Sequence, residues 1–285
     1  MYKMMVLDLD GTLLNDEKKV SRENIEWIQR AYKEKGVRSV IATGRPLGYA
    51  NDISNSYGNG FAHSIIACNG AIIKENETNQ YIHKVDFSEE EIFNIRNIFL
   101  EENADYMMLY TDEEAIVEAT SREAFEITGI SADQRKTRIE KIEDRIKKNS
   151  QLIKLLCVIG GDTRTLDKIR KRVNGIEGIE TTVICDHMYK TENHTFESKY
   201  IDIMKKGCSK KNAILILANK LGIKREEIIV MGDGGNDRSM FECAGLKIAM
   251  ANAEPYLKEK ADFVTASNND NGVAKAIQKF IFNEA

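Results

Sequence analysis

Residues 4–14 read Met4-Met5-Val6-Leu7-Asp8-Leu9-Asp10-Gly11-Thr12-Leu13-Leu14. The apolar run at the start of this stretch ends in Asp-Leu-Asp-Gly, which indicates a buried strand whose carboxyl end opens into a loop. Asp8 and Asp10 stand two residues apart, and side chains alternate along a strand, so both carboxylates can face one site. Gly11 permits the tight turn that follows. The stretch therefore predicts an acidic site at the end of a strand.

The rest of the N-terminal third continues this strand–helix alternation. Ser21 can cap a helix that stops at Gly36, and Val37–Ala42 then reads as a second buried strand. A third apolar run, Ser64–Cys68, ends at Asn69-Gly70. Strands and helices that alternate with short links predict a parallel sheet.

The C-terminal third has the same pattern. It predicts helices that start at Ser209 and at Pro255, and a closing helix over Gly272–Phe282. It also predicts three further strands, over Ile228–Met231, Lys247–Met250 and Asp262–Thr265. We therefore expect one α/β core domain made of residues 1–83 and 189–285.

The middle of the chain differs from both ends. Ser88 and Glu91 form a capping-box pattern before a helix, and four strand candidates follow it. None of these strands ends in an acidic or glycine-rich loop. We expect residues 84–188 to form an inserted α+β domain that covers the core as a cap.

Composition restricts the class of function. Hydrophobic residues make up 42% and charged residues 30%, which is the balance of a folded globular protein. The formal net charge of −4 supplies no basic field for nucleic acid. No apolar run approaches the roughly 20 residues that cross a bilayer. The five scattered cysteines form no Cys-x-x-Cys pair, so we expect reduced thiols and a cytoplasmic location.

Polar residues at several strand and helix ends supply what phosphoryl transfer requires. Asp8 is a plausible nucleophile, and Asp10 can protonate a leaving group and then deprotonate water. Thr43 offers a hydroxyl and Gly44 an open backbone N–H at the end of the second strand. Lys210 lies in the first turn of its helix, where its ammonium and the helix dipole favour the same anion.

A last loop adds hard oxygen ligands. Asp233 and Asp237 belong to the run Gly232-Asp233-Gly234-Gly235-Asn236-Asp237, which follows a strand. Carboxylate oxygens are the ligands that Mg²⁺ prefers, so these residues are candidates to bind it or to support its ligands.

Four stretches together resemble the motifs of the haloacid dehalogenase (HAD) superfamily. They are Asp8-Leu9-Asp10-Gly11-Thr12-Leu13-Leu14, Thr43-Gly44-Arg45, Ser209-Lys210 and Gly232-Asp233-Gly234-Gly235-Asn236-Asp237. Their order and the long insertion after the second resemble the Cof-like sugar-phosphatase branch. The resemblance spans the whole chain and implies a Rossmann-like core with an inserted α/β cap.

The resemblance also implies a role for each motif residue. Asp8 would be the nucleophile and a metal ligand, and Asp10 would be the acid/base and bind the metal through its backbone carbonyl. Asp233 would complete the protein ligands of Mg²⁺, supported by Asp237. Thr43 and Lys210 would hold the phosphoryl oxygens, with Asn236 on the same side. The chain departs from the family at Lys211, where members commonly have glycine.

Several assignments stay open at this point. Lys206 is the alternative to Lys210 as the phosphate-binding lysine. Asn69 is either a turn residue before Gly70 or a ligand contact, and Arg45 either pairs with a core carboxylate or touches substrate.

The function expected from these residues is Mg²⁺-dependent hydrolysis of a small phosphorylated metabolite through an aspartyl-phosphate. Sugar phosphates are the family-level default, and pyridoxal phosphate and flavin mononucleotide remain alternatives. A phosphomutase of the same superfamily would return the phosphate to the substrate. A non-catalytic phosphate-binding module would lack residues at the nucleophile or metal positions, and this chain has them all.

Overall fold

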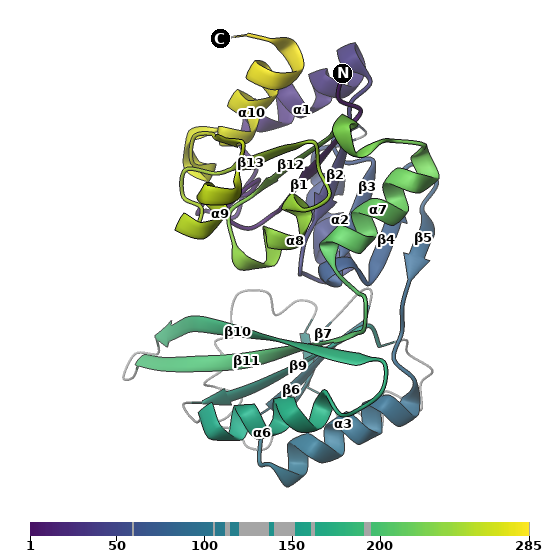
Figure 1. Cartoon of the computed structure of the whole chain (residues 1–285), viewed down its shortest axis with the longest axis vertical. Coiled ribbons are helices and arrows are strands. Elements are labelled where there is room, and N and C mark those ends of the chain that lie inside the picture. Colours follow the sequence, from purple (N-terminus) through teal and green to yellow (C-terminus); the bar gives the residue numbers. More distant parts are fainter. Residues whose placement is uncertain are drawn as a thin grey trace. The chain divides into compact units, whose positions relative to one another are not determined.

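A computed structural model describes residues 1–58, 60–104, 106–111, 115–119, 137–139, 152–160, 163–190 and 195–284. The chain divides into two compact units (Figure 1). The core unit comprises Met1–Lys84 and Cys208–Ala285, and the inserted unit comprises Val85–Gly207. The α/β class with an inserted α+β segment, expected from the sequence, is confirmed.

The core unit is built on an eight-stranded sheet. In spatial order its strands are β14 (Phe263–Val264), β13 (Leu246–Ala249), β12 (Ile228–Gly232), β1 (Met4–Leu7), β2 (Arg38–Ala42), β3 (Ser64–Ala67), β4 (Ile72–Glu75) and β5 (Gln80–Lys84). The first six run parallel, and β4 and β5 are antiparallel additions at one edge. The central strand β1 is buried along its whole length.

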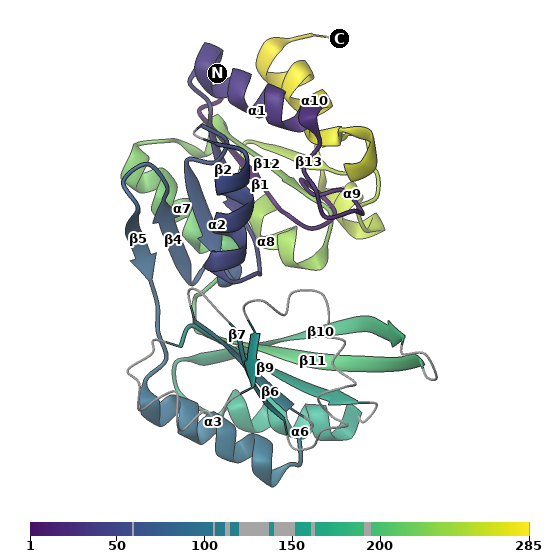
Figure 2. The ribbon, with the colours of Figure 1, turned by 180° about the vertical axis from the view of Figure 1, so that it is seen from behind.

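Helices cover both faces of this sheet. They are α1 (Arg22–Lys35), α2 (Leu47–Ser56), α7 (Lys210–Leu221), α8 (Arg238–Phe241), α9 (Pro255–Lys260) and α10 (Gly272–Ile277). Figure 1 shows α7 and α8 on one face, and Figure 2 shows α1 and α2 on the other, with α10 beside α1. The unit is therefore a three-layer α/β sandwich.

The helix boundaries follow the predicted capping signals. The Ser21 hydroxyl accepts a hydrogen bond from the Asn24 N–H at 3.1 Å, and α1 ends at Gly36 with φ of 68°. Ser209 caps α7 through the Asn212 N–H at 3.1 Å, and α7 ends at Gly222 in the same left-handed conformation. These helix starts and stops are confirmed.

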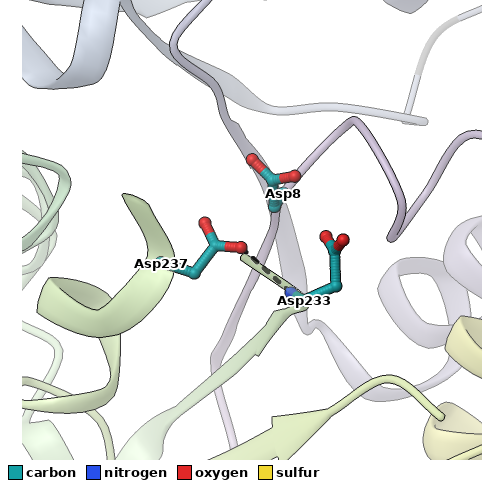
Figure 3. Close-up of side chains that lie close together, drawn as sticks. All are labelled: Asp8, Asp233 and Asp237. Atoms are coloured by element: carbon teal, nitrogen blue, oxygen red, sulfur yellow. Dashed lines mark hydrogen bonds between the residues drawn. The ribbon is translucent and has the colours of Figure 1, made fainter. Parts of the chain in front are cut away.

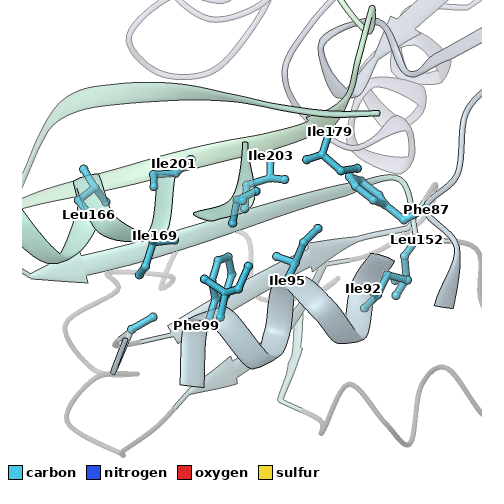
Figure 4. Packing of buried hydrophobic residues seen from close by; sticks show 13 residues of the cluster. Phe87, Ile92, Ile95, Phe99, Leu152, Leu166, Ile169, Ile179, Ile201 and Ile203 are labelled. Carbon is cyan, nitrogen blue, oxygen red and sulfur yellow. The ribbon is translucent and has the colours of Figure 1, made fainter. Parts of the chain in front are cut away.

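The inserted unit has its own sheet and its own core. Its strands, in spatial order, are β10 (Ile179–Lys190), β11 (Thr195–Lys205), β9 (Lys154–Gly160), β6 (Tyr106–Tyr110), β7 (Ala115–Ala119) and β8 (Thr137–Ile139). Helices α3 (Glu89–Glu101) and α6 (Thr163–Val173) pack against each other, and Figure 4 shows the buried aliphatic and aromatic side chains of this layer. The predicted capping box at Ser88 and Glu91 is confirmed.

Two parts of the fold differ from the expectations. The hairpin of β4 and β5 was not predicted, because both strands are short and only the first two residues of β4 are buried and apolar. The chain leaves the inserted unit at Gly207 rather than at residue 188, because β11 pairs with both β10 and β9.

Two further observations bear on the composition. Among the cysteines whose side chains are described, Cys68, Cys208 and Cys243 form no disulfide with one another. Cys157 and Cys185 lie in strands whose side chains fall outside that part. Across the described residues, no helix combines the length and apolar character that a membrane span requires.

Candidate active site

The site lies at the point in the sheet where the order in which strands are added reverses, beside β1. From β1 the chain moves outward through β2 and β3, and it later returns to add β12 on the other side of β1. In open parallel sheets, ligands bind beyond the carboxyl ends of the strands at such a switch point. Asp8 directly follows β1 and Asp233 directly follows β12. The Asp8 N–H donates to the Met231 carbonyl at 3.1 Å, which keeps the two strand ends level.

Lys210 is buried between two carboxylates. Its Nζ lies 2.5 Å from Asp8 Oδ1 and 2.7 Å from Asp237 Oδ1, and the Lys210 side chain is only 1% exposed. Burial alone would lower the pKa of Lys210, but the negative charges of Asp237 and Asp8 raise it above its ordinary value. Lys210 is therefore held as a cation beside Asp8.

Asp237 supports the loop that carries Asp233. Its second oxygen, Oδ2, accepts the N–H groups of Asp233 and Gly234 at 3.0 and 3.1 Å. Gly232 approaches this side chain so closely that a Cβ there would lie 2.7 Å from the Asp237 Oδ2. Both carboxylate oxygens of Asp237 are thus occupied by donors from the chain itself.

Asp8, Asp233 and Asp237 form an acidic cluster whose ligand atoms lie within 4.8 Å of one another (Figure 3). Burial, and then the charge of Asp237, raise the pKa of Asp8 well above its usual range. The same two causes raise the pKa of Asp233 to about 6. A divalent cation would remove this repulsion, so the donor set fits a hard metal ion. Because both Asp237 oxygens are occupied, Asp8 and Asp233 are the better ligands.

The turn after β1 is fitted closely against Asp233. The Thr12 hydroxyl donates to Asp233 Oδ1 at 2.9 Å. Gly11 has φ of +73°, and a Cβ at this position would lie 2.1 Å from Asp233 Oδ2. Only glycine fits here, because any side chain would displace the carboxylate.

Asp10 is more exposed than Asp8 and is paired with two basic side chains. Arg45 Nε and Nη2 each lie 2.6 Å from one of its oxygens, and Lys18 Nζ lies 3.1 Å from Oδ1. Burial would raise the pKa of Asp10, but the hydrogen bonds and charge of Arg45, helped by Lys18, lower it below its ordinary value. Of the two interpretations left open for Arg45, the structure shows the carboxylate pairing.

The remaining motif residues surround this centre. Thr43 follows β2, is buried, and accepts the Arg45 N–H on its hydroxyl at 3.1 Å. Asn69 Oδ1 lies 2.9 Å from the position that a Cβ on Gly44 would occupy. Asn236 is exposed on the Asp233–Asp237 loop and lies beside Gly234. The alternative lysine, Lys206, is exposed in the inserted unit, where its N–H donates to the Gly178 carbonyl.

Three residues of this region were not singled out in the sequence. Thr12 belongs to the first motif, but its bond to Asp233 joins segments that are distant in the chain. Lys18 lies in a loop with φ of +60°, which leaves no periodic signal. Asn252 Nδ2 donates to the Gly11 carbonyl at 2.7 Å. Its place just after β13, at the same sheet edge, was the available signal.

Comparison with known proteins decides the family. Residues 5–277 match the model of the haloacid dehalogenase-like hydrolases. The chain belongs to this family. Its relatives in the family include the putative phosphatase YxeH of Bacillus subtilis, which is 30% identical over 99% of both chains.

Two further HAD relatives carry more specific names. A 5-amino-6-(5-phospho-D-ribitylamino)uracil phosphatase of Bacillus subtilis, YwtE, is 30% identical over 98% of both chains. A solved structure, the HAD subclass IIB sugar phosphatase BT4131, is 25% identical, covers 98% of both chains and superposes with a TM-score of 0.75. The chain is a HAD-superfamily hydrolase of the phosphatase type.

Proposed function

We propose that this HAD hydrolase removes the phosphoryl group of a small phosphorylated metabolite, with a sugar phosphate as the first candidate, in a Mg²⁺-dependent reaction. The observation that carries the proposal is the buried Asp8 carboxylate, which lies at the switch point of the sheet with Lys210 bonded to one oxygen at 2.5 Å. A carboxylate held beside a buried cation is suited to receive a phosphoryl dianion.

In the first step, an oxygen of Asp8 bonds to phosphorus as the ester P–O bond of the substrate breaks. The leaving oxygen takes a proton from Asp10, which gives the free alcohol and a phosphorylated Asp8. Lys210 and Thr43 donate to the phosphoryl oxygens, with the Gly44 N–H and Asn236 on the same side. The position of these groups supports this role, since Thr43, Gly44 and Asn236 lie in loops after strands and Lys210 begins α7 beside Asp8.

In the second step, water attacks the phosphorus of the aspartyl-phosphate. Asp10 takes a proton from this water as the bond between phosphorus and Asp8 breaks, which releases inorganic phosphate, frees the Asp8 carboxylate and returns Asp10 to its protonated form. The lowered pKa of Asp10 suits this proton acceptor role. For the first step, the negative charge of an arriving phosphate would raise that pKa and draw Arg45 toward the substrate.

The metal ion would be held by Asp8, Asp233 and, as the family resemblance implies, the Asp10 backbone carbonyl. Mg²⁺ bound there would neutralise charge on the phosphoryl oxygens. Asp237 acts indirectly, because it orients the Asp233 backbone and Lys210 through its two oxygens.

Substrate selection is assigned to the inserted unit. Its own hydrophobic core makes it a separate folding layer, and all the proposed catalytic residues belong to the core unit. The two named relatives act on a phosphorylated ribityl compound and on sugar phosphates by their names, which supports a phosphorylated polyol or sugar. A cytoplasmic location is part of the proposal, and its support is the scattered placing of the five cysteines without a Cys-x-x-Cys pair.

The test is a screen of phosphorylated metabolites with purified protein and Mg²⁺, run beside the Asp8→Asn variant and beside samples in excess chelator. Phosphate release from at least one sugar or polyol phosphate, absent in both controls, is expected. A single turnover in ¹⁸O-labelled water should place the label in inorganic phosphate. Return of the phosphoryl group to substrate without label would show a mutase instead.

Selection by the inserted unit has a separate test. A related inserted domain grafted onto this core should change the ranking of metabolites by kcat/KM while hydrolysis of nitrophenyl phosphate persists. A folded, active graft that keeps the original ranking would remove this role from the inserted unit.

A further inference from the structure

The turn between β3 and β4 has an unusual backbone. Cys68, Asn69 and Gly70 are consecutive, and all have positive φ, at 49°, 53° and 107°. Left-handed conformations are unfavourable for residues with a Cβ, and two such residues in succession persist only where surrounding contacts hold them. The turn is therefore a strained segment, and its contacts show what holds it in this conformation.

One side of the turn is bonded to the loop after β2. The Cys68 N–H donates to the Arg45 carbonyl, and the Asn69 N–H donates to the Thr43 carbonyl, each at 3.0 Å. The Asn69 side chain also lies against Gly44. Two successive N–H groups of the turn thus bind the Thr43–Arg45 loop.

The other side of the turn contacts the start of α7. A Cβ added to Gly70 would lie 2.3 Å from the Ser209 carbonyl oxygen and 2.5 Å from its carbon. Ser209 is the residue that caps α7, and Lys210 is the first residue of that helix. Gly70 and the backbone that carries Lys210 are thus in direct contact.

We infer that the Cys68–Gly70 turn is a positioning element that sets the separation between Thr43 and Lys210. The inference rests on the proposed function, which assigns these two residues to the phosphoryl oxygens. Thr43 follows β2 and Lys210 begins α7, and the turn touches the backbone of both segments. Displacement of either group by about 1 Å can cost ~10²-fold in a catalytic site.

The alternative explanation is that the turn only connects two strands and that Gly70 is needed only because its φ is positive. The chain contains a matched control for this alternative. Gly36 also has positive φ, at +68°, and also lies in the core unit, but a Cβ there would meet nothing within 4 Å. Gly36→Ala therefore imposes the backbone cost without a clash, whereas Gly70→Ala imposes both.

The experiment compares wild type, Gly70→Ala and Gly36→Ala. Calorimetry with Mg²⁺ present measures the affinity for orthophosphate, steady-state kinetics gives kcat and KM for nitrophenyl phosphate, and urea unfolding gives stability. Both variants should lose stability. Only Gly70→Ala should weaken phosphate binding and raise KM, by about tenfold or more. Equal phosphate affinity in the two variants would overturn the inference.

A second pair of variants keeps the test decisive if Gly70→Ala does not fold. Asn69→Ala makes the positive φ unfavourable, while Asn69→Gly removes the same side chain and restores the freedom of φ. A positioning turn predicts tighter phosphate binding by Asn69→Gly than by Asn69→Ala. Equal losses in both would assign Asn69 to direct ligand contact and overturn the positioning role.

The wild-type measurements also separate failure of the inference from failure of the proposed function. Wild-type protein that neither binds orthophosphate nor hydrolyses any phosphomonoester would overturn the proposed function, and the inference with it. Normal wild-type activity together with the failed contrasts above would overturn the inference alone.

Discussion

Arg45 holds Asp10 by a two-point ion pair, with Nε 2.6 Å from Oδ2 and Nη2 2.6 Å from Oδ1. The guanidinium also lies over the Tyr49 ring, 3.9 Å from its centroid. Two parallel bonds fix the orientation of a carboxylate more strictly than a single bond does. In this arrangement Asp10 is an anion that is ready to accept a proton, and its orientation depends on Arg45.

Replacement of Arg45 should therefore affect the second chemical step more than the first. In Arg45→Ala the pKa of Asp10 rises, because burial persists while the main cationic partner is lost. A weaker and less oriented base should slow hydrolysis of the intermediate by about 10²-fold. Rapid mixing with nitrophenyl phosphate should then show a burst of nitrophenol. An unchanged kcat without a burst would contradict this role, and Arg45→Lys, which keeps charge but not the fork, should be intermediate.

Asp8→Asn should abolish turnover without loss of stability. An amide oxygen is a poor nucleophile, so we expect kcat to fall by at least about 10³-fold. The substitution also removes one of three clustered negative charges, and the raised pKa of Asp8 shows that this charge is unfavourable without a bound cation. The melting temperature in chelator should thus stay equal or increase. A melting temperature that falls by several degrees would indicate a structural role for the charge.

Thr12 offers a test of the proposed metal ligand Asp233. Thr12→Val removes the hydroxyl that donates to Asp233 Oδ1 and keeps a similar shape. The carboxylate should lose its orientation, so half-maximal activation should require about 10-fold more Mg²⁺, the lower end of the loss that is typical when such a supporting contact is removed. Thr12→Ser retains the hydroxyl and should behave as wild type. Identical Mg²⁺ dependence in the Val and Ser variants would show that the bond does not matter.

The inserted unit provides a pH test that is independent of catalysis. Glu91 forms an ion pair with Lys205 and accepts the Ser88 N–H. Burial would raise the pKa of Glu91, but these partners lower it. A lowered pKa in the folded state means that the stabilisation is present above the unfolded value, about 4.3, and is lost as the pH falls through the folded pKa.

Glu91→Gln should hence reduce the free energy of unfolding at pH 7, by about 1–2 kcal/mol. The difference from wild type should shrink as the pH falls below about 4. Glu90→Gln is the matched control, because Glu90 is exposed in the same first turn of α3. A constant difference between Glu91→Gln and wild type from pH 7 to pH 3 would contradict the ion-pair explanation.

The sequence predicted the parts of the core whose signals are local. Buried strands are continuous apolar runs, and Asp8 and Asp233 follow two of them directly. Helix ends depend on neighbouring residues, so Ser21, Gly36 and Ser209 could be interpreted without knowledge of the fold.

Contacts between distant segments had no such signal. The pairing of Arg45 with Asp10 was one of two open alternatives, since a charged side chain after a strand fits either. The β11 strand went unrecognised because its alternation of polar and apolar residues becomes meaningful only when β9 and β10 flank it. The strain at Cys68 and Asn69 is likewise invisible in the residue types.

The double engagement of Asp237 limits what can replace it. One oxygen accepts from the Lys210 ammonium, and the other accepts two backbone N–H groups. Asparagine has a single acceptor oxygen, so its amide NH₂ would face either the Lys210 ammonium or the two backbone N–H groups, which are donors themselves. Glutamate is longer, and its carboxylate would collide with the loop that closes on Gly232. Position 237 should consequently tolerate no other residue in a saturation library selected for activity, although it has no contact with substrate in the proposed reaction. A mutational scan alone would therefore misidentify Asp237 as a catalytic residue, although it takes no part in making or breaking bonds.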